Sequence, residues 1–439
     1  MKKIKFPPYL QWEVTPRCNH NCIHCYNYWR SEGKVMNETK LYHEITDKII
    51  DVHPVSVVIT GGEPLLVFQK IKYDISRLVD NGISVSINTN ADLVNDEIAL
   101  FLKKHNISAF VSLPCSEKSI CDMITNTKNS VINTSHGIKK LIDNGVRVTV
   151  NMVVMKSNID YIYSTAKYCI ENLHVNSFFA SRVGKPINAS TEFDTELLTL
   201  TDLYKMQKEL IRIKRNFGIR VGTAGPIPAC SINSDDAFQL FAYRKNCSAG
   251  KTSYGIDSNG NVKACPRDEK IYGNILNEDF STIWERMSEW RDGSLLPEEC
   301  KECSAKNRCG GGCRLDSFPH TGQKNKLDTM ANLDNLPIKY TKHATDINVE
   351  FDTKLFVPPS LKFLKEDFGW RVSNFGKTIY ITDEMKNFLE NNDYFTIRSF
   401  SDSNDLPIDI SKAIIFQLLR NNILLTEQFY KMINLKEVK

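Results

Sequence analysis

Residues 9–27 read YLQWEVTPRCNHNCIHCYN, an apolar and β-branched run followed closely by three cysteines. The run predicts a β-strand, so Cys18, Cys22 and Cys25 are expected on the loop that follows it. Five more runs of this kind occur in the first half of the chain. The six runs cover residues 9–15, 55–62, 84–90, 108–114, 147–154 and 175–183.

Amphipathic helical patterns separate these runs, for example over residues 37–52 and 134–146. The second pattern ends at Asn144 and Gly145, which suit a helix C-cap. Strands that alternate with helices predict an α/β fold with a parallel sheet, and six consecutive units predict a partial (β/α)6 barrel similar to a TIM barrel. Such barrels place their chemistry on the loops that follow the strands, and the three cysteines occupy one of these loops.

The composition predicts two or three domains, because 439 residues exceed the size of a single hydrophobic core. Lys and Arg number 56 against 52 Asp and Glu, and the formal charge of +4 is too small to indicate a nucleic-acid partner. The N-terminus lacks the apolar core of a signal peptide, and no run reaches the roughly 18 apolar residues of a membrane span. We therefore expect a cytoplasmic protein with no nucleic acid and no membrane among its partners.

Thirteen cysteines are present, an odd number gathered in tight groups, which in a reducing compartment indicates metal ligation rather than a disulfide framework. Nine belong to motifs, three near the start and six between residues 247 and 313. The other four are isolated, and we expect isolated cysteines to be small buried apolar residues. The isolated ones are Cys115, Cys121, Cys169 and Cys230.

The number of thiols in the first group bears on its chemistry. A closed structural zinc site uses four ligands, and so does an iron-sulfur cluster held entirely by protein. Three thiols leave one corner open for a substrate or cofactor, which favours a chemical role. The alternative is a zinc site completed by His20 or His24.

A second motif, GGEP, closes the second predicted strand at residues 61–64. Its two glycines let backbone groups approach a ligand closely, and Glu63 adds an acceptor beside them. By itself such a sequence is also typical of an ordinary turn. Together, the CxxxCxxC loop after the first strand and GGEP after the second resemble the radical S-adenosylmethionine (SAM) enzymes.

The resemblance implies that SAM and one [4Fe–4S] cluster are cofactors of the barrel. Cys18, Cys22 and Cys25 would each hold one iron, and SAM would chelate the fourth. Reduction of the cluster would cleave SAM to a 5′-deoxyadenosyl radical, which takes a hydrogen atom from an unactivated carbon. The implied SAM contacts are Gly61, Gly62 and Glu63 for the amino group, His24 for the adenine, and Ser112 and Asn151 for the ribose or carboxylate, although these last two are equally suited to cap strands.

The chain departs from the family pattern after the fourth strand. Many relatives read Ser-Leu-Asp-Gly there with an arginine downstream, whereas residues 112–126 read SLPCSEKSICDMITN. The contact to the SAM carboxylate is therefore left unassigned. Cys115 stands where the Gly would be and is a candidate hydrogen-atom donor, with a passive thiol as the alternative.

Residues 247–313 are rich in turn residues and cysteines, so we expect metal rather than a large apolar core to hold them together. A zinc ribbon is one interpretation. The spacing also resembles the SPASM extension of peptide-modifying radical SAM enzymes, which implies two auxiliary [4Fe–4S] clusters. The implied ligands are Cys247, Cys265 and Cys313 for the first and Cys300, Cys303 and Cys309 for the second.

The last cysteine of the SPASM pattern is absent, because no cysteine follows Cys313. Asp328 or Asp334 are candidate oxygen ligands in its place, and an open corner is the alternative. Cys230 is a further candidate, to complete the first auxiliary cluster.

A small third unit is predicted near the C-terminus. Residues 361–374 and 376–384 are expected to be strands of a β-hairpin, followed by helical patterns over 383–391 and 407–422. This (α+β) arrangement resembles a winged helix, but the segment from Val349 to Glu427 has 9 Lys and Arg against 12 Asp and Glu, a net charge of −3 that argues against DNA. It is similar instead to the PqqD-like domains that bind the leader of a precursor peptide as an added strand.

The expected organisation is a radical SAM partial barrel over 1–225, a SPASM domain over 226–335, a linker over 336–347 and a PqqD-like domain over 348–430. The resemblance implies a peptide maturase that forms an oxidative cross-link in a ribosomally made precursor, with a reductase or flavodoxin-type electron donor as a second partner. The alternatives are a peptide epimerase, a formylglycine-forming sulfatase maturase, a small-molecule dehydrogenase, and a catalytically silent protein that binds clusters and peptide.

Overall fold

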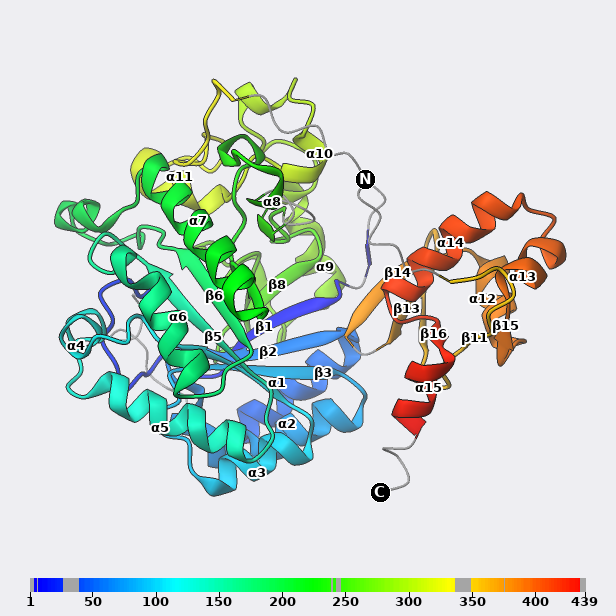
Figure 1. Ribbon diagram of the computed structural model, residues 1–439, viewed down its shortest axis with the longest axis horizontal. Helices are drawn as coiled ribbons and strands as arrows, with labels where there is room; N and C mark the ends of the chain where they lie inside the picture. Colours follow the sequence, from blue (N-terminus) through cyan, green and yellow to red (C-terminus); the bar gives the residue numbers. More distant parts are fainter. Residues whose placement is uncertain are drawn as a thin grey trace. The chain divides into compact units, whose positions relative to one another are not determined.

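A computed structural model describes most of the chain, and Figure 1 shows its elements. The described residues are 4–5, 7–26, 39–237, 240–241, 246–335, 349–374 and 376–434. The chain forms two compact units, a larger one over Tyr9–Lys339 and a smaller one that combines Met1–Pro8 with Tyr340–Lys439. The linker predicted over 336–347 lies outside the described residues.

The larger unit contains all six predicted strands in one sheet, and each pairs in parallel with the next, which confirms the predicted fold class. The strands are β1 Tyr9–Glu13, β2 Ser56–Thr60, β3 Ser84–Thr89, β4 Ser108–Ser112, β5 Val148–Val154 and β6 Ser177–Arg182. In β5, for example, Val150, Met152 and Val154 are completely buried, and Thr149 and Val153 on the opposite face are only partly so, although Asn151 on that face is also buried. One face of the sheet is therefore a core, and the other is the lining of the partial barrel.

Helices follow the strands and cover one face of the sheet (Figure 1). They are α1 Thr39–Val52, α2 Phe68–Asp80, α3 Asp96–Lys104, α4 Lys118–Thr125, α5 Ser130–Asp143, α6 Ile162–Glu171 and α7 Leu200–Phe217, with 3-10 turns η2 Pro64–Val67, η3 Ile159–Tyr161 and η4 Thr191–Glu196. The helix predicted over 134–146 is α5, and it ends as predicted, with Asn144 as C-cap and Gly145 at φ +74°. This left-handed conformation is the one that glycine adopts without strain.

The sheet is wider than the six predicted strands. β7 Arg220–Gly222 adds in parallel to β6, and β8 Ser253–Ile256 adds in parallel to β1. β9 Asn261–Lys263 and β10 Gly273–Asn274 continue the sheet beyond β8 in antiparallel pairing. The predicted cysteine-rich segment therefore shares a ten-stranded sheet with the barrel and borders it at β1, the strand that leads into the first cysteine loop.

The cysteine-rich segment also has an apolar core, contrary to the expectation that metal alone would hold it together. Tyr254, Trp284 and Trp290 are almost completely buried, and Phe280 stacks on Trp284 with ring centroids 6.1 Å apart. The remaining elements of residues 226–335, the predicted SPASM domain, are short: η5 Ala229–Ser231, α8 Asp235–Ala237, α9 Phe280–Arg286, η7 Ser288–Trp290, η8 Glu298–Cys300, α10 Lys306–Cys309 and α11 Arg314–Thr321.

The smaller unit differs from the predicted hairpin. Residues 361–374, predicted as one strand, fold back on themselves as β12 Lys362–Glu366 and β13 Gly369–Asn374, and β14 Lys377–Ile381 completes a three-stranded antiparallel sheet. Gly369 is at φ +141°, and a Cβ there would lie 2.3 Å from the Ile381 carbonyl oxygen, so the fold requires a glycine at the turn.

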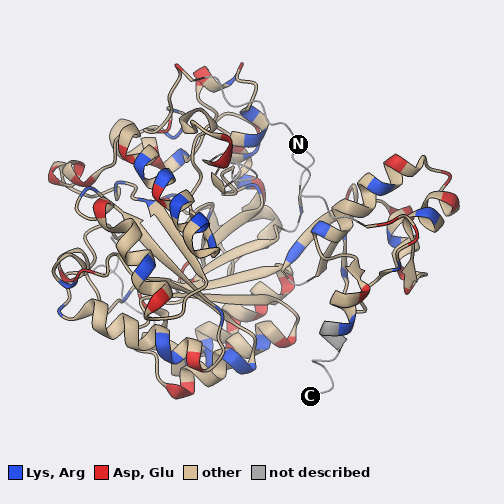
Figure 2. Ribbon diagram, viewed as in Figure 1, with Lys and Arg blue, Asp and Glu red and all other residues tan. Residues whose placement is uncertain are grey.

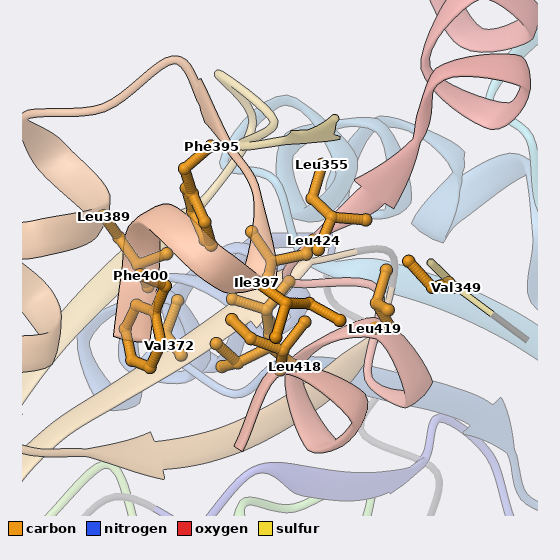
Figure 3. Close-up of a cluster of buried hydrophobic side chains, with 12 residues drawn as sticks. Val349, Leu355, Val372, Leu389, Phe395, Ile397, Phe400, Leu418, Leu419 and Leu424 are labelled. Atoms are coloured by element: carbon orange, nitrogen blue, oxygen red, sulfur yellow. The ribbon is translucent and has the colours of Figure 1, made fainter. Parts of the chain in front are cut away.

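Two helices of this unit confirm the predicted patterns, α12 Asp383–Glu390 and α14 Ile408–Arg420. The other elements are β11 Leu355–Phe356, β15 Tyr394–Phe395 and β16 Leu425–Thr426, which form a second sheet, and helices α13 Ile397–Ser403 and α15 Glu427–Asn434. Figure 3 shows that buried side chains from strands and helices, among them Val372, Ile397, Phe400 and Leu418, meet in one apolar cluster. The smaller unit therefore has its own core.

Charged residues of both signs are interspersed along the ribbon in Figure 2, in agreement with the low net charge. Among the residues that the structure describes, no helix is both long and apolar enough to cross a membrane.

Candidate functional site

The first cysteine loop leaves β1 and is fixed from outside by α4. The backbone N–H groups of Asn21 and Ile23 donate to the carbonyls of Thr125 and Ile124 at 3.0 and 2.9 Å. These bonds satisfy the backbone on either side of Cys22 and hold the loop in one conformation. Cys18, Cys22 and Cys25 are all partly exposed, so the three thiols are accessible to a ligand.

The GGEP turn packs directly on the start of this loop. The N–H of Gly62 donates to the Thr15 carbonyl at 2.6 Å, and the N–H of Glu63 donates to the Arg17 carbonyl at 2.7 Å. A Cβ on Gly61 would lie 2.3 Å from the Thr15 oxygen, and one on Gly62 would lie 2.0 Å from the Arg17 oxygen. The two glycines are therefore required for the close approach of two backbones, one of which carries the cysteines.

The Glu63 side chain connects strand ends. Its carboxylate is buried and accepts hydrogen bonds from the Thr89 hydroxyl at 2.7 Å, the Asn90 N–H at 2.8 Å and the Leu65 N–H at 3.0 Å. Burial raises the pKa of Glu63 to about 7, against the lowering effect of these bonds. The side chain thus joins the end of β2 to the end of β3 beneath the cysteine loop.

The end of β3 also supports the loop. The Asn90 amide donates to Asn19 Oδ1 at 2.8 Å and lies 4.0 Å from Cys18 Sγ. His20 Nε2 is 2.7 Å from Asp92 Oδ2, and both side chains are buried. Since this ring nitrogen is paired with Asp92, the arrangement gives no support to His20 as a zinc ligand.

Ser112 and Asn151, both predicted at strand ends, are directly opposite in the parallel ladder. Ser112 does end β4, but the prediction for Asn151 is wrong, because it lies in the middle of β5. Ser112 is exposed, whereas Asn151 is buried and its Oδ1 accepts a hydrogen bond from the Ser181 hydroxyl at 2.7 Å. Ser181 in turn accepts from the Ala224 N–H at 2.8 Å, so a chain of polar contacts crosses β5 and β6 to the loop after β7.

His24 and Cys115 differ in exposure. His24 is partly exposed between the second and third cysteines. Cys115 is completely buried, and its sulfur accepts contacts from the Glu117 N–H at 3.4 Å and the Thr165 hydroxyl at 4.0 Å. Burial raises the pKa of the Cys115 thiol. Cys121 and Cys169 are also buried, as expected for isolated cysteines, but Cys230 is partly exposed, so the expectation is wrong for this residue.

Glu13 is a site residue that the sequence analysis missed. It lies at the end of β1 and is buried, and its Oε1 accepts a hydrogen bond from the Tyr26 hydroxyl at 3.4 Å. Burial raises the pKa of Glu13 to about 8, although the charge of Lys263 on β9 opposes the shift. The sequence signal that could have identified Glu13 is an acidic residue within an otherwise apolar strand.

Tyr26 lies close to cysteines from two different motifs. Burial and the charge of Glu13 raise the pKa of its hydroxyl. The thiols of Cys25 and Cys265 raise this pKa further, so both thiols are within electrostatic range of the ring. Both cysteine motifs therefore act electrostatically on this tyrosine, in agreement with the pairing of β8 beside β1.

The structure brings together the three cysteines predicted for the first auxiliary site. Burial, followed by the charges of Cys247 and Cys313, raises the pKa of Cys265 to about 12. Burial also raises the pKa of Cys313 to about 11, against the opposing charge of Arg267, whose Nη1 donates to Cys313 Sγ at 3.8 Å.

The three cysteines predicted for the second auxiliary site also lie together. Burial, followed by the charge of Cys309, raises the pKa of Cys300 to about 11, and Cys303 and Cys230 add to the shift. The structure therefore places Cys230 beside the second group, whereas the sequence analysis assigned it to the first.

The two aspartates proposed as oxygen ligands are in different environments. Asp328 is buried, and its carboxylate accepts from Arg182 Nη2 at 2.5 Å, from the Cys313 N–H at 2.7 Å and from the Met330 N–H at 2.9 Å. Arg182, at the end of β6, also pairs with Asp316 at 3.0 Å. Asp334 is exposed. Asp328 thus fixes the backbone of Cys313 and ties the segment to the barrel.

The donor set fits iron-sulfur clusters. Thiolates are the ligands that such clusters use, and backbone N–H groups that donate to sulfur tune their potentials. Such donors are present here: the N–H of His20 lies 3.3 Å from Cys18 Sγ, and that of Ala305 lies 3.4 Å from Cys303 Sγ. Within the described ranges, no three His, Cys, Asp or Glu side chains are grouped closely enough to hold a single metal ion.

Comparisons with known families agree with this geometry. The Radical SAM superfamily matches residues 12–169, and the SPASM iron-sulfur cluster-binding domain matches residues 247–304. The chain carries a radical SAM domain and a SPASM domain. The radical SAM domain implies SAM and a [4Fe–4S] cluster as cofactors, and the SPASM domain implies auxiliary iron-sulfur clusters.

Individual relatives resemble the chain over most of its length. The AdoMet-dependent heme synthase of Methanosarcina barkeri is 25% identical over 334 residues, which cover 72% of this chain and 93% of the synthase. The mycofactocin maturase MftC of Mycobacterium tuberculosis is 25% identical over 341 residues, which cover 71% of this chain and 79% of MftC. The crystal structure of Streptococcus suis SuiB bound to S-adenosylmethionine superposes with a TM-score of 0.61 at 20% identity and covers 75% of this chain and 78% of SuiB, which establishes a shared fold.

Proposed function

We propose that this radical SAM/SPASM enzyme modifies a ribosomally made precursor peptide and forms an oxidative intramolecular cross-link in it, a thioether, C–C or C–O bond. The observation that carries the proposal is that β8, which lies between Cys247 and Cys265 in the sequence, pairs in parallel with β1, the strand that leads into the SAM-binding loop. Cys25 of that loop and Cys265 of the first auxiliary group also both act electrostatically on Tyr26. An auxiliary cluster held beside β1 in this way would be placed to accept an electron from a substrate radical in the barrel.

Electron balance explains why this proximity favours oxidation. When bound, SAM and its cluster supply a 5′-deoxyadenosyl radical that takes one hydrogen atom from the substrate. The substrate carbon radical must then either regain a hydrogen atom or lose an electron. A cross-link forms by the second route: the peptide loses a second hydrogen as a proton, and the electron passes to an auxiliary cluster, from which an external flavodoxin-type carrier or reductase removes it.

The proposed binding roles follow from the positions of the residues. Cys18, Cys22 and Cys25 hold the radical SAM cluster on a loop that the GGEP turn supports. Gly61, Gly62 and Glu63 are assigned to the amino group of SAM and His24 to its adenine. Ser112 and Asn151 are assigned to its ribose or carboxylate. The buried carboxylate of Glu63 acts mainly by positioning, because three protein donors already occupy it. The backbone around Gly61 and Gly62 is then the part of the motif that meets the amino group.

The burial of Cys115 favours cross-linking over epimerisation. An epimerase needs a group that returns a hydrogen atom to the substrate radical, and such a group must contact the substrate. None of the Cys115 surface is exposed, and its sulfur is engaged by Glu117 and Thr165.

The smaller unit supports a peptide substrate. In the order β12-β13-β14, the strands β12 and β14 each have one strand partner among the described residues, so each offers an edge for an added strand. The unit has a net charge of −3 over 349–427, which disfavours nucleic acid. MftC is named a maturase, and SuiB has been crystallised with its precursor peptide SuiA. We therefore assign leader recognition to this PqqD-like unit, over residues 348–430.

A small-molecule substrate is the second candidate, because the heme synthase is among the relatives. The match covers 93% of that protein but only 72% of this chain, so the synthase has little room for a counterpart of the smaller unit. A sulfatase maturase likewise has less need of the smaller unit. A catalytically silent binding protein would retain the fold without cleaving SAM.

The test uses a precursor peptide, to be sought among short open reading frames beside this one, as a labelled synthetic leader and as a full-length substrate. A chain that ends before Tyr340, and so lacks most of the smaller unit, should bind the leader at least tenfold more weakly while still forming 5′-deoxyadenosine. Equal leader affinity of the truncated and full-length chains would refute the recognition role.

The product is tested by mass spectrometry in deuterated water. The cross-linked peptide should be lighter by two hydrogens and carry no deuterium on carbon. An unchanged formula with one deuterium on a backbone carbon would instead establish epimerisation. Replacing Cys18, Cys22 and Cys25 together with Ala should abolish 5′-deoxyadenosine formation, and persistent SAM cleavage in that variant would refute the radical mechanism.

A further inference from the structure

The second cysteine group contains four thiols from two separate parts of the chain. Cys300, Cys303 and Cys309 come from the CxxC-x5-C motif, and Cys230 comes from the 3-10 turn η5, about seventy residues earlier. We propose that Cys230 is the fourth ligand of the second auxiliary cluster and replaces the C-terminal cysteine that this chain lacks. The proposal rests on the SPASM domain and is independent of the identity of the substrate.

A direct contact places the Cys230 turn against the motif. The N–H of Ala229 donates to Cys309 Sγ at 3.3 Å. The residue next to Cys230 in sequence therefore lies against a predicted cluster ligand. An N–H donor of this kind is typical of the surroundings of cluster sulfurs.

A second contact places Cys230 beside the segment that would carry the missing cysteine. The Cys230 sulfur accepts a hydrogen bond from the N–H of Asn332 at 3.4 Å. Asn332 lies downstream of Cys313, in the part of the chain where the SPASM pattern expects its last ligand. Cys230 thus brings a thiol to the same place from the opposite direction along the chain.

The turn itself is held rigidly by the barrel. The buried Gln207 of α7 donates to the Ser231 carbonyl at 3.2 Å, and the Ser231 hydroxyl donates to the Pro228 carbonyl at 2.7 Å. On the downstream side, the Asn335 amide donates to the Tyr204 hydroxyl, also on α7, at 3.3 Å. One helix therefore positions both segments, as a preformed ligand requires.

The two aspartates are weaker candidates for the vacant ligand position. The Asp328 carboxylate is occupied by Arg182 and by the Cys313 backbone, which belongs to the first auxiliary group. Asp334 is near Asn332 in sequence but its side chain is exposed. With Cys230 in the second cluster, the first retains three thiolates, Cys247, Cys265 and Cys313, and one open iron.

The first test measures clusters in a chain in which Cys18, Cys22 and Cys25 are Ala, so that only auxiliary clusters remain. Added to this background, Cys230→Ser should reduce the bound iron by about one to four atoms per chain, because one [4Fe–4S] cluster degrades to [3Fe–4S] or is lost. The same variant should change one component of the electron paramagnetic resonance spectrum. Asp334→Ala and Cys169→Ala, a change at a buried cysteine outside all groups, should leave iron and spectrum unchanged.

Combination with single variants of each group identifies the cluster. Cys230→Ser and Cys303→Ser should alter the same spectral component, and their double variant should lose no further cluster, whereas Cys230→Ser with Cys265→Ser should affect both clusters. The proposal is overturned if Cys230→Ser retains full iron and the parent spectrum, or if its effect coincides with that of Cys265→Ser.

A second measurement uses the unmodified holoenzyme and does not depend on the folding of variants. Alkylation with iodoacetamide followed by peptide mass spectrometry should leave Cys230 protected together with Cys300, Cys303 and Cys309, and chelation of iron should make all four reactive at once. Alkylation of Cys230 at the same rate in the holoenzyme and in the iron-free chain would also overturn the proposal.

Discussion

Replacing Gly62 with Ala is a direct test of how the GGEP turn supports the cysteine loop. The new Cβ would lie 2.0 Å from the Arg17 carbonyl oxygen, whereas ordinary contact begins at 3.4 Å. The two backbones must therefore separate by more than 1 Å, and the contact atom belongs to rigid backbone rather than to a flexible side chain.

The expected cost follows from the contacts that separation breaks. The hydrogen bonds from Gly62 to Thr15 and from Glu63 to Arg17 would be lost, at about 0.5–1.5 kcal/mol each. Residual overpacking adds about 1–3 kcal/mol. The total is about 2–6 kcal/mol, and a displacement of about 1 Å at the loop lowers the rate of SAM cleavage by about 100-fold.

The assay compares 5′-deoxyadenosine formation, bound iron and thermal unfolding for Gly62→Ala and a matched control, Gly225→Ala. A Cβ on Gly225 would meet nothing within 4 Å, so the control should behave like the parent chain. Gly62→Ala should lose iron from the first loop and retain the auxiliary clusters. Full iron content and an unchanged cleavage rate in Gly62→Ala would refute the role assigned to the glycine.

Three further predictions concern residues away from this turn. The fold raises the pKa of Glu13 from 4.5 to about 8. Between these pH values the folded chain binds more protons than the unfolded chain, so its stability falls as the pH rises. Glu13→Gln should flatten this dependence, measured as the difference in melting temperature between pH 5 and pH 8. Arg182→Met leaves Asp316 and Asp328 buried without their cation and should cost about 3–5 kcal/mol in thermal unfolding, and an unchanged melting temperature would contradict the role given to the pair. Cys115→Ala should leave both SAM cleavage and product mass unchanged, whereas loss of product alone would establish hydrogen donation by this thiol.

Much of the larger unit was predictable because its signals are local. The six strands β1 to β6 are β-branched runs of period two, and the helices between them repeat apolar residues at helical spacing. The loop cysteines and GGEP follow strands directly, so parallel pairing alone brings them to one edge of the sheet. In the smaller unit, the turn at Asp367 and Phe368 was missed although Asp367 is a typical turn residue, because Phe368 between it and Gly369 continues the apolar run.

The membership of the cysteine groups was only partly predictable. The close spacing of Cys300, Cys303 and Cys309 indicates a shared site, because a few residues of chain cannot carry them far apart. Cys230 has no cysteine near it in sequence, and about seventy residues separate it from Cys300, so no pattern distinguishes it from the buried Cys115 or Cys169.

The sequence by itself determined the element order, the parallel sheet, the position of the first cysteine loop and the presence of further cysteine motifs. Only the tertiary structure decided that β8 lies beside β1, that Cys25 and Cys265 both act on Tyr26, that GGEP packs against the loop backbone, and that the turn of Cys230 lies against Cys309. The physical reason is range: periodicity and turn chemistry act over a few neighbouring residues, whereas these contacts join segments tens to hundreds of residues apart and form only when the whole chain packs.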